Sequence, residues 1–453
     1  MFKRKIMSKL DEWKENKDKK PLIIKGLRQI GKTYIVKEFA KLRYENAFIL
    51  DFRKQTSIHS IFDGDFDVNN MVLLMSSLSS ENKVIESSKM VPYKTLIIFD
   101  ELQDCPNARS SLKYFKEDGR FDVICTGSLI GIKGYKKNNN QFRGIGVGSE
   151  EQIEMKAMDF EEFLWANNVD SKIIDLLKDC FNQRKSVPIL LHNQFLDWIR
   201  KYIVVGGLPE VVKKFIDTND FGEVRLEQKR IISNYESDFG THLNDDNEII
   251  VNELEKSKIM DVFSSIPKQL AKENKKFMYS TINKKASGRE YASAITWLRD
   301  YGLINICYNL STIDSPLDFF VINDIFKVYV ADIGLLTAML EQDAQFKILS
   351  DELNIGKGMI YENLVSDAIS KNNKPLYYFS KDSGLEIDFI LPLFGELHLI
   401  EVKAKDGNTK AANYVLNDDK YKVNKLLKLT SQNIGFDNNK LTVPYYLAFY
   451  IFK

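Results

Sequence analysis

The chain has 453 residues, and its 64 Lys and Arg residues against 63 Asp and Glu residues leave a formal net charge of +1. This balance excludes a global basic field for nucleic acid, so any such binding requires a local patch, and the length predicts two to four domains. Four widely spaced cysteines and the lack of an apolar run of about 18 residues argue against a disulfide framework, a zinc site or an ordinary membrane span, so we expect a cytoplasmic protein.

The first informative segment is a glycine-rich loop between a predicted strand and a predicted helix. The apolar run 21–25 predicts a short buried strand, and the apolar spacing of residues 33–40 predicts a helix. Between them, residues 26–33 read Gly-Leu-Arg-Gln-Ile-Gly-Lys-Thr and match G-x-x-x-x-G-K-[ST] at every fixed position. Backbone N–H groups of such a loop surround phosphates, so the pattern predicts binding of ATP with Mg²⁺.

Roles within this loop follow from its chemistry. Lys32 is expected to reach the outer phosphates, and the Thr33 hydroxyl is expected to bind Mg²⁺. The predicted nucleotide-binding residues are Gly26, Gln29, Ile30, Gly31, Lys32, Thr33 and Tyr34.

A second buried strand ends in two acids. Residues 96–99 are all apolar and are followed by Asp100 and Glu101, and ligands bind at the carboxyl ends of parallel strands. Asp100 is predicted to hold Mg²⁺ through water, and Glu101 to polarise the attacking water. The alternative is an acid that caps a helix after a core strand.

A third strand, residues 121–126, leads to Gly127 and Ser128. Ser128 is the predicted sensor of the γ-phosphate, as expected where a strand is inserted into a P-loop sheet. The alternative is that residues 126–128 form a turn that caps the following segment.

The segment that follows is expected to close the first domain. Residues 136–151 form a long polar loop, after which Asp159 and Glu162 have the spacing of a capping box, so a helix is predicted to begin there. We place an ATPase core at residues 1–165. Helical patterns then continue to about residue 245, interrupted by Gly206-Gly207-Leu208-Pro209, which predicts a helical lid at residues 166–245.

Residues 246–318 are predicted to form a winged helix-turn-helix, because helix, helix, recognition-type helix and hairpin follow in that order. The predicted recognition helix spans residues 287–301, and DNA is its expected partner. The segment is also expected to present a local basic surface, with the aromatic residues Tyr279 and Tyr291 among its cations. Its cations are Lys272, Lys275, Lys276, Lys284, Lys285, Arg289 and Arg299. The alternative is a winged helix used for packing or protein contacts.

The last segment, residues 319–453, alternates helices and strands and carries acids where burial is expected. Glu362 falls on a predicted helix, Asp388 on a strand, and Glu401 and Lys403 two apart on the next strand. This arrangement resembles the PD-(D/E)xK nuclease core, which implies that Asp388 and Glu401 hold a divalent metal and that Lys403 orients or activates a water for attack on phosphorus. Asp388, Glu401 and Lys403 are therefore the candidate catalytic residues here. The alternative is a structural acid–base pair on one strand face.

Read in order, these motifs resemble those of a known group. They are Gly26 to Thr33, Leu96 to Glu101, Thr126-Gly127-Ser128, Asp159 to Leu164, Val205 to Glu210 and Glu386 to Lys403. The chain is similar to prokaryotic AAA-type ATPases that carry a C-terminal domain of unknown function related to PD-(D/E)xK nucleases, although Ile387 stands where that motif has proline.

The resemblance implies an α/β fold class. Its parts are a P-loop core whose parallel sheet has an additional strand, a helical lid, a winged helix-turn-helix and an α/β restriction-endonuclease-like C-terminal domain. The finger arginine does not transfer, and Arg109, Arg120 and Arg143 are the candidates. AAA-type cores often complete their site with a neighbouring copy, so a homo-oligomer stays open.

The sequence therefore favours Mg²⁺-dependent ATP binding and hydrolysis, coupled to DNA through the winged helix and the C-terminal domain, with no membrane partner. An alternative is a nucleotide-dependent switch that recognises a protein partner and has an inert C-terminal domain. A third hypothesis is a nuclease for which ATP only licenses cleavage.

Overall fold

The computed structural model describes residues 2–129, 148–243, 249–353, 356–404 and 407–453. These residues form two compact units, Lys3–Lys156 and Ala157–Lys453, and Phe2 belongs to the second. We call them the N-terminal unit and the C-terminal unit. No helix in the described ranges combines the length and the apolarity needed to cross a membrane.

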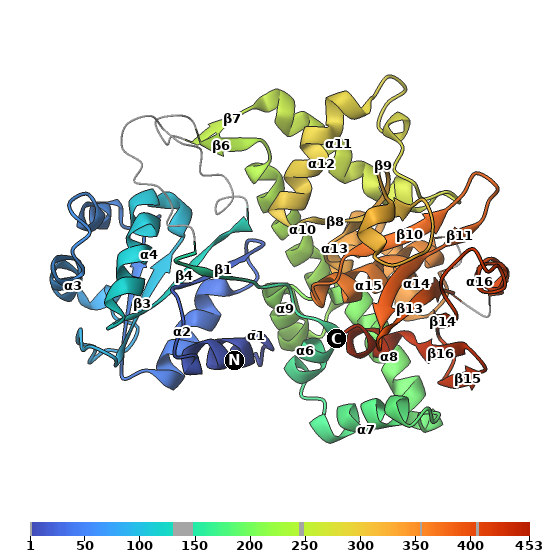
Figure 1. The fold of residues 1–453 in the computed structure, drawn as a ribbon, viewed down its shortest axis with the longest axis horizontal. Helices are drawn as coiled ribbons and strands as arrows, with labels where there is room; N and C mark the ends of the chain where they lie inside the picture. Colours follow the sequence, from blue (N-terminus) through green and yellow to red (C-terminus); the bar gives the residue numbers. More distant parts are fainter. Residues whose placement is uncertain (1, 130–147, 244–248, 354–355, 405–406) are drawn as a thin grey trace. The chain divides into compact units, whose positions relative to one another are not determined.

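The N-terminal unit is a parallel sheet with helices packed on it (Figure 1). Its strands run in the order β2-β3-β4-β1-β5, and every pairing is parallel. Strand β4 separates β1 from β3, so the additional strand of the predicted core is present. The strands are β1 (Leu22–Gly26), β2 (Asn46–Asp51), β3 (Thr95–Asp100), β4 (Asp122–Ser128) and β5 (Glu151–Glu154), and the helices are α1 (Ile6–Glu15), α2 (Lys32–Arg43), α3 (Val68–Ser76) and α4 (Pro106–Asp118).

Burial of β3 on both faces explains why this region reads as a continuous apolar run. All six residues of β3 are buried, and Phe99 packs edge-on against Phe62 and Phe115. Each such side chain contributes about 1.5–3 kcal/mol through burial. Helix α4 begins at Pro106 and ends before Gly119, the arrangement that proline and glycine favour at helix ends. The result is a rigid layer that presents Asp100 and Glu101 at the carboxyl edge.

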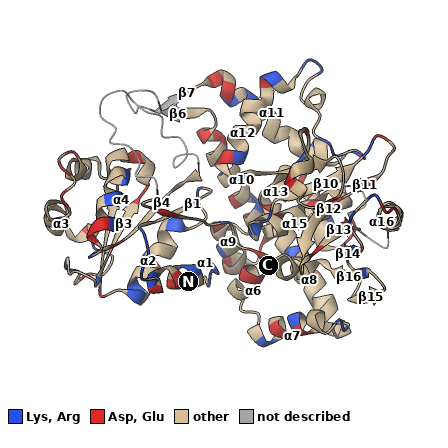
Figure 2. Cartoon of the chain, viewed as in Figure 1, with Lys and Arg blue, Asp and Glu red and all other residues tan. Residues whose placement is uncertain are grey.

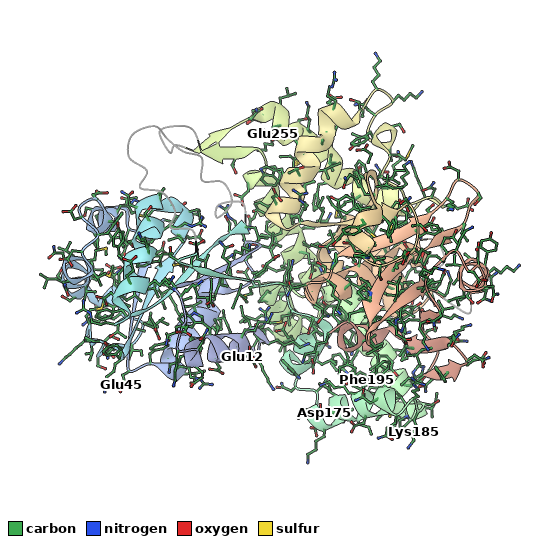
Figure 3. The ribbon with its side chains drawn as sticks, in the orientation of Figure 1. Glu12, Glu45, Asp175, Lys185, Phe195 and Glu255 are labelled. Atoms are coloured by element: carbon green, nitrogen blue, oxygen red, sulfur yellow. The ribbon has the colours of Figure 1, made fainter. Side chains whose placement is uncertain are left out.

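The C-terminal unit begins with a bundle of helices. They are α6 (Phe160–Ala166), α7 (Ser171–Asn182), α8 (Ile189–Val205), α9 (Pro209–Thr218) and α10 (Phe221–Asp238). The predicted capping box is present, since Glu162 N–H donates to Asp159 Oδ1 at 2.9 Å and Asp159 N–H donates to Glu162 Oε2 at 3.1 Å. Phe195 of α8, labelled in Figure 3, is buried, and its ring centre lies 5.7 Å from that of Tyr446.

The first unit ends at Lys156, nine residues before the predicted boundary at 165, because the chain after it is fixed within the second unit. Met158 N–H donates to Gly207 O at 2.7 Å, and Tyr202 Oη and Lys371 Nζ donate to Met158 O at 2.8 and 3.0 Å. A Cβ on Gly207 would lie 2.0 Å from Met158 O. This close approach of two backbones explains the glycine of the Gly206-Gly207-Leu208-Pro209 stretch.

The middle of the C-terminal unit has the expected order of elements. Helix α11 (Glu253–Leu270), a short 3₁₀ helix (Tyr279–Thr281), α12 (Gly288–Tyr301) and the antiparallel hairpin β8 (Ile304–Leu310) and β9 (Val321–Val330) follow one another. A two-stranded ribbon, β6 (Thr241–Leu243) and β7 (Ile249–Val251), precedes them. Strand β8 also pairs in parallel with β10, so the hairpin belongs to the four-stranded sheet β11-β10-β8-β9. The winged helix and the boundary at 318 therefore stay predictions.

The last part of the unit adds a second sheet, β12-β13-β14-β16-β15. Its strands and those that join the first sheet are β10 (Leu376–Ser380), β11 (Glu386–Ile387), β12 (Phe389–Leu393), β13 (Glu396–Val402), β14 (Lys425–Thr430), β15 (Gly435–Asp437) and β16 (Lys440–Pro444). The helices are α13 (Ile333–Met339), α14 (Gln342–Leu349), α15 (Lys357–Lys371), α16 (Lys410–Leu416) and α17 (Ala448–Ile451).

Helix α15 is the central helix of this part, and 12 of its 15 residues are buried. It packs against strands of both sheets. The Asn363 amide bonds both backbone groups of Val330 on β9, each at 2.9 Å, which fixes the register of helix and strand. Glu362 is thereby held beside β9.

Candidate functional site

The glycine-rich loop joins β1 to α2 in the N-terminal unit, as predicted. Gly26 ends β1, where an added Cβ would lie 2.4 Å from Met155 O. Gln29 and Gly31 have φ values of 63° and 85°, so the backbone turns sharply before Lys32 begins the helix. Ile30 is buried beneath the loop, and Tyr34 is half exposed on α2. The loop thus directs backbone N–H groups and a helix N-terminus to one place.

Lys32 is buried under this loop. Its Nζ donates to the carbonyl oxygens of Gly26 and Leu27 at 3.0 and 2.9 Å. Burial lowers the pKa of Lys32 to about 8, although the nearby carboxylates of Glu101 and Asp100 act in the opposite direction. A triphosphate at this position would supply the negative charge that favours the protonated lysine.

Thr33 and Asp100, the two predicted Mg²⁺ residues, are in contact. Thr33 Oγ1 donates to Asp100 Oδ1 at 2.7 Å, and Thr126 Oγ1 donates to the same oxygen. Burial raises the pKa of Asp100, while these two hydroxyl bonds act to lower it. Hydroxyl and carboxylate oxygens are the donors that Mg²⁺ prefers, so the residues fit the ion. Thr126 was missed by the sequence analysis, although its place near the end of β4 was the available signal.

Glu101 is held in place by side chains that the sequence did not reveal. Its backbone is in the left-handed region, with φ 54°. Arg53 Nη2 lies 3.3 Å from Glu101 Oε2, and Gln103 Nε2 donates to the same oxygen. Arg53 also donates to Asp104 at 2.8 Å. The candidate base therefore points toward a guanidinium that follows β2.

Ser128, the predicted sensor, ends β4 in register with Gly26 on β1. It is buried at the carboxyl edge, two residues beyond Thr126. The arginine candidates differ in setting. Arg109 is buried and pairs with Glu150 at 2.7 Å, and Arg120 pairs with Asp118 at 2.6 Å. Arg143 and most of the predicted loop 136–151 lie outside the described residues.

A second polar site lies in the C-terminal unit, at the junction of its two sheets. Asp388 is the single residue between β11 and β12, and the register Phe389 to Ile400 places it next to Glu401 on β13. Val402 N–H donates to Asp388 Oδ2 at 2.8 Å. Lys403, one residue beyond β13, donates to Glu401 and lies 3.8 Å from Asp388. The structure thus brings together Asp388, Glu401 and Lys403.

Burial dominates the electrostatics of this second site. It raises the pKa of Glu401 to about 7, and the neighbouring charge of Asp388 acts in the same direction. Burial also raises the pKa of Asp388. Glu401 Oε1 is buried and has no hydrogen-bond partner. An unpartnered buried carboxylate oxygen costs free energy unless a cation or donor meets it.

These residues fit a divalent cation in one respect, because an orphaned carboxylate oxygen lies beside a second carboxylate. The described ranges hold no group of three or more His, Cys, Asp or Glu residues arranged for a metal. Any ion would therefore take few ligands from protein side chains and keep several waters, as Mg²⁺ commonly does.

Glu362, on the predicted helix, is engaged by two lysines. Lys275 Nζ donates to Glu362 Oε1, and Lys327 Nζ lies 3.8 Å from Oε2. Burial is the largest single effect and acts to raise the pKa of Glu362, but the two lysines, together with the hydrogen bond from Tyr329, outweigh it and lower the pKa. Lys327 was not among the predicted site residues, and Lys275 was expected on the local basic surface. A lysine within the apolar alternation of β9 was the available signal for the first.

The other cations of the predicted basic surface are more open. Lys272, Lys284, Lys285 and Arg289 are exposed, whereas Arg299 pairs with Asp300 at 3.1 Å. Acids are interspersed, and Figure 2 shows both charges along α11. The exposed residues of α12 include Ala292, Ser293 and Thr296 between its two arginines. Fewer of the predicted cations are therefore open to a binding partner than the sequence indicated.

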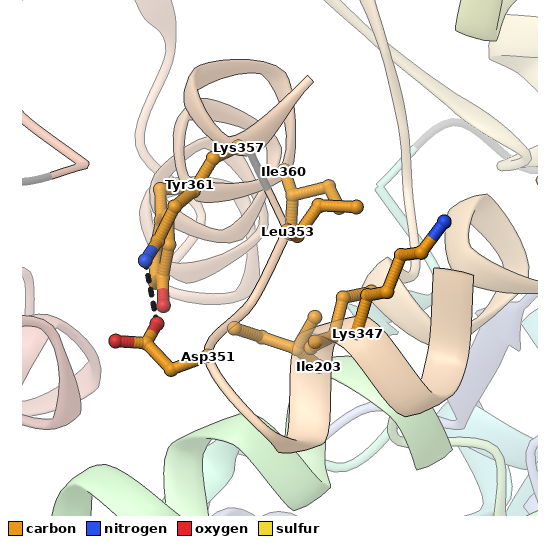
Figure 4. A pocket seen from close by; sticks show the side chains of 8 residues that line it. Ile203, Lys347, Asp351, Leu353, Lys357, Ile360 and Tyr361 are labelled. Atoms are coloured by element: carbon orange, nitrogen blue, oxygen red, sulfur yellow. Dashed lines mark hydrogen bonds and ion pairs between the residues drawn. The ribbon is translucent and has the colours of Figure 1, made fainter. Parts of the chain in front are cut away.

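A small pocket lies where α14 leads to α15 (Figure 4). Its lining includes Ile203, Ile348, Ile360 and the ion pair between Lys357 and Asp351, whose atoms are 2.5 Å apart. The pocket therefore combines apolar walls with charged ones, which include this ion pair and Lys347.

Comparison with known families assigns the N-terminal unit. Residues 18–164 match the AAA domain family. Residues 196–345 match a domain of unknown function (DUF8612), and residues 357–447 match another (DUF4143). With its parallel sheet and glycine loop, the N-terminal unit is thus an AAA-type P-loop ATPase domain. The rest of the chain carries two domains whose family descriptions state no function, and the first spans the predicted boundaries at 245 and 318.

Comparison with solved structures finds weak likenesses. The RuvB Holliday junction branch migration motor of Thermotoga maritima has 9% identity and a TM-score of 0.27 over 67% of this chain and 89% of that one. A FIGL-1 AAA domain in complex with ADP has 12% identity and a TM-score of 0.23, covering 66% and 84%. The Pif1 helicase from Bacteroides has 13% identity and a TM-score of 0.23, and the match spans 45% of this chain and half of the helicase. Curated protein sequences produce no match.

Proposed function

We propose that the chain is a Mg²⁺-dependent ATPase whose hydrolysis cycle is coupled to DNA engagement by the C-terminal unit. The observation that carries the ATPase part is the 2.7 Å contact between Thr33 Oγ1 and Asp100 Oδ1, next to buried Lys32. Two oxygen donors and one ammonium group meet where the glycine loop directs its N–H groups. This is the donor set that a nucleoside triphosphate and its metal require.

Each residue has a distinct part in hydrolysis. Lys32 binds the outer phosphates as it leaves its backbone carbonyl partners, and Thr33 with Asp100 orients the metal. Mg²⁺, when bound, neutralises charge on the phosphates. Glu101 accepts a proton from the attacking water, for which it must be free of Arg53, now 3.3 Å away. Ser128 at the end of β4 senses the γ-phosphate.

Support for the DNA part comes from the exposed face of α12 and the loop before it. Small residues between Arg289 and Arg299 allow close approach to a duplex, and Lys272, Lys284 and Lys285 are open to phosphates. The pairing of Arg299 with Asp300 favours the alternative, a nucleotide-dependent switch that binds a protein partner. Asp388, Glu401 and Lys403 support a nuclease-like site in which Lys403 orients a water beside a metal.

One experiment joins these parts. ATP turnover of the full chain is measured with and without duplex and single-stranded DNA, and DNA binding is followed by fluorescence polarisation over a salt series. Coupling predicts that DNA stimulates turnover and that binding weakens steeply as salt rises. Turnover that DNA leaves unchanged, with no measurable binding at low salt, would favour the partner switch.

A further inference from the structure

A buried arginine before the first helix contacts the glycine-rich loop. Arg4 is 6% exposed and lies two residues before α1, which contacts α2. Its Nη1 donates to the carbonyl oxygen of Ile30 at 3.3 Å, and its Nη2 donates to that of Lys156 at 2.7 Å. The guanidinium group therefore joins the middle of the loop to the segment that follows β5.

The Lys156 carbonyl belongs to a segment that the sheet holds in place. The residue before it, Met155, donates its N–H to Lys25 O at 2.8 Å, which continues the pairing of β5 with β1. The Met155 carbonyl in turn lies so close to Gly26 that a Cβ there would be 2.4 Å from its oxygen. One arm of the Arg4 guanidinium is therefore anchored on the sheet, and the other arm holds the loop.

The direction of the Ile30 carbonyl determines where the next N–H group points. In a trans peptide the C=O and N–H bonds point to opposite sides, so an Ile30 oxygen held by Arg4 turns the Gly31 N–H the other way. Two other carbonyls of the loop instead face the ammonium group of Lys32. The loop thus uses two cations, Lys32 and Arg4, to hold carbonyl oxygens in different directions.

Glycine alone does not determine this orientation. Gly31 has a φ of 85°, and glycine adopts positive and negative φ with similar ease, so the peptide before it can rotate at low cost. After such a rotation the peptide would present a carbonyl oxygen, rather than an N–H group, to a bound phosphate. A contact from outside the loop is therefore needed to select one orientation, and Arg4 provides such a contact.

We propose that Arg4 is a positioning residue of the nucleotide site, which holds the Ile30–Gly31 peptide so that the Gly31 N–H faces the phosphates. Arg4 acts through the loop and does not itself bind the nucleotide. An arginine suits this position because its planar fork donates in two fixed directions and stays charged. This inference rests on the proposed ATPase function and adds to it a residue that lies outside the G-x-x-x-x-G-K-[ST] pattern.

The test compares binding with turnover in Arg4→Met, which keeps an unbranched side chain and removes its donors. Loss of one N–H contact to a charged phosphate should weaken ADP binding and raise the KM for ATP about 10- to 100-fold. Because this contact is made before and during the reaction, kcat should stay within about threefold of wild type. Calorimetry should still find one ADP site per chain. Fewer sites and a lower kcat, at unchanged Kd and KM, would show a merely structural role and overturn the proposal.

Arg43→Met is the matched control. Arg43 on α2 donates to Asp11 on α1 at 2.7 Å, so this variant also removes an arginine that holds α1, but one that lies at the exposed surface. It should leave the Kd for ADP and the KM for ATP unchanged. An increase in KM equal to that of Arg4→Met would identify loosening of α1 as the cause and overturn the proposal.

A second variant covers the case in which Arg4→Met does not fold. Arg4→Lys keeps the buried charge but places one nitrogen where the structure has two, so KM should still rise by about threefold or more at unchanged kcat. A wild-type KM in the folded Arg4→Lys protein would then overturn the proposal.

Failure here is distinguishable from failure of the proposed function, because ADP binding is measured without turnover. Wild-type binding and turnover, together with unchanged Kd and KM in Arg4→Met, would overturn only the inference. A wild-type protein that binds ADP without hydrolysing ATP would instead overturn the ATPase proposal. In that case the loss of ADP affinity in Arg4→Met would still support the positioning role, and an unchanged affinity would overturn it.

Discussion

Two buried lysines, one in each unit, show how differently the two polar sites are built. Lys32 faces backbone carbonyls, and burial lowers its pKa to about 8. Lys327 faces two carboxylates, and its pKa is raised despite complete burial. The first site has a cation that is only partly satisfied and so favours an incoming anion. In the second, one cation is already satisfied and the unmet demand lies with a carboxylate oxygen.

The two sites also differ in how far along the chain their residues are spread. The P-loop site takes its lysine and threonine from one loop and its acids from the end of one strand. The second polar site, in the C-terminal unit, instead brings together Lys275, Lys327, Glu362 and Asp388 with the end of β13. A local motif therefore determines the first site, while packing of α15 against two sheets determines the second.

The largest effect is expected at Lys32, the lysine whose positive charge is only partly satisfied. Lys32→Ala should abolish detectable ATP binding, because no other ammonium group is held under the loop by its carbonyls among the described contacts. Isothermal titration calorimetry with a non-hydrolysable ATP analogue measures this. Lys25→Ala is the matched control, since Lys25 on β1 contacts the Gln152 side chain at the exposed surface and should bind normally. Retained affinity in Lys32→Ala would remove the P-loop assignment.

Glu101→Gln separates binding from chemistry at the same site. We expect ATP affinity close to that of wild type and turnover lower by about 10²–10⁴-fold, because the amide cannot accept the proton of the attacking water. Steady-state phosphate release checks it. Hydrolysis at the wild-type rate would show that another residue is the base.

Lys327, whose charge is already neutralised by carboxylates, should affect folding stability rather than ligand binding. Lys327→Met leaves the buried Glu362 and the partly buried Glu386 without their shared cation, which should destabilise the C-terminal unit by about 3–5 kcal/mol. Lys420→Met removes an exposed pair with Asp418 and serves as a control without measurable effect. Chemical denaturation followed by tyrosine and tryptophan fluorescence compares them. Equal denaturation midpoints for the two variants would contradict the prediction that Lys327 stabilises the fold by neutralising Glu362 and Glu386.

The smallest effect is a pH dependence that only the first lysine should show. ATP affinity should fall about fivefold between pH 8 and 9, because free Lys32 loses its proton as the pH rises through about 8. The free protein should change in the opposite sense. Since the folded pKa lies below the ordinary 10.5, the unfolded chain binds more protons between these values, and folding stability rises with pH there.

Calorimetry at constant ionic strength from pH 7 to 9.5 tests this dependence. Lys32→Arg is the matched control, because a guanidinium keeps its charge throughout this range, so any residual binding should not depend on pH. An affinity of the wild type that stays constant over the range would contradict the partly satisfied lysine.

Local patterns were reliable where neighbouring residues decide the structure. The glycine loop between β1 and α2, the buried strand that ends in Asp100, and the capping box of Asp159 and Glu162 all depend on contacts within a few residues. The sequence could not reveal that Arg53 pairs with Glu101. The two residues are 48 positions apart and meet only because β2 and β3 are neighbours in the sheet. Nor could it show that Met158 joins the second unit, since that depends on the close approach of Gly207.

By itself, the sequence determined a P-loop ATPase domain and the residues at its strand and helix ends, because backbone geometry and apolar periodicity act over short range. It also identified Asp388, Glu401 and Lys403 as chemically related. Only the tertiary structure decided which lysine meets which carboxylate. Burial makes each charge depend on its partners in space, and α15 brings Glu362 against β9, where Lys327 neutralises it. The same arrangement leaves the buried Oε1 atom of Glu401 without a hydrogen-bond partner.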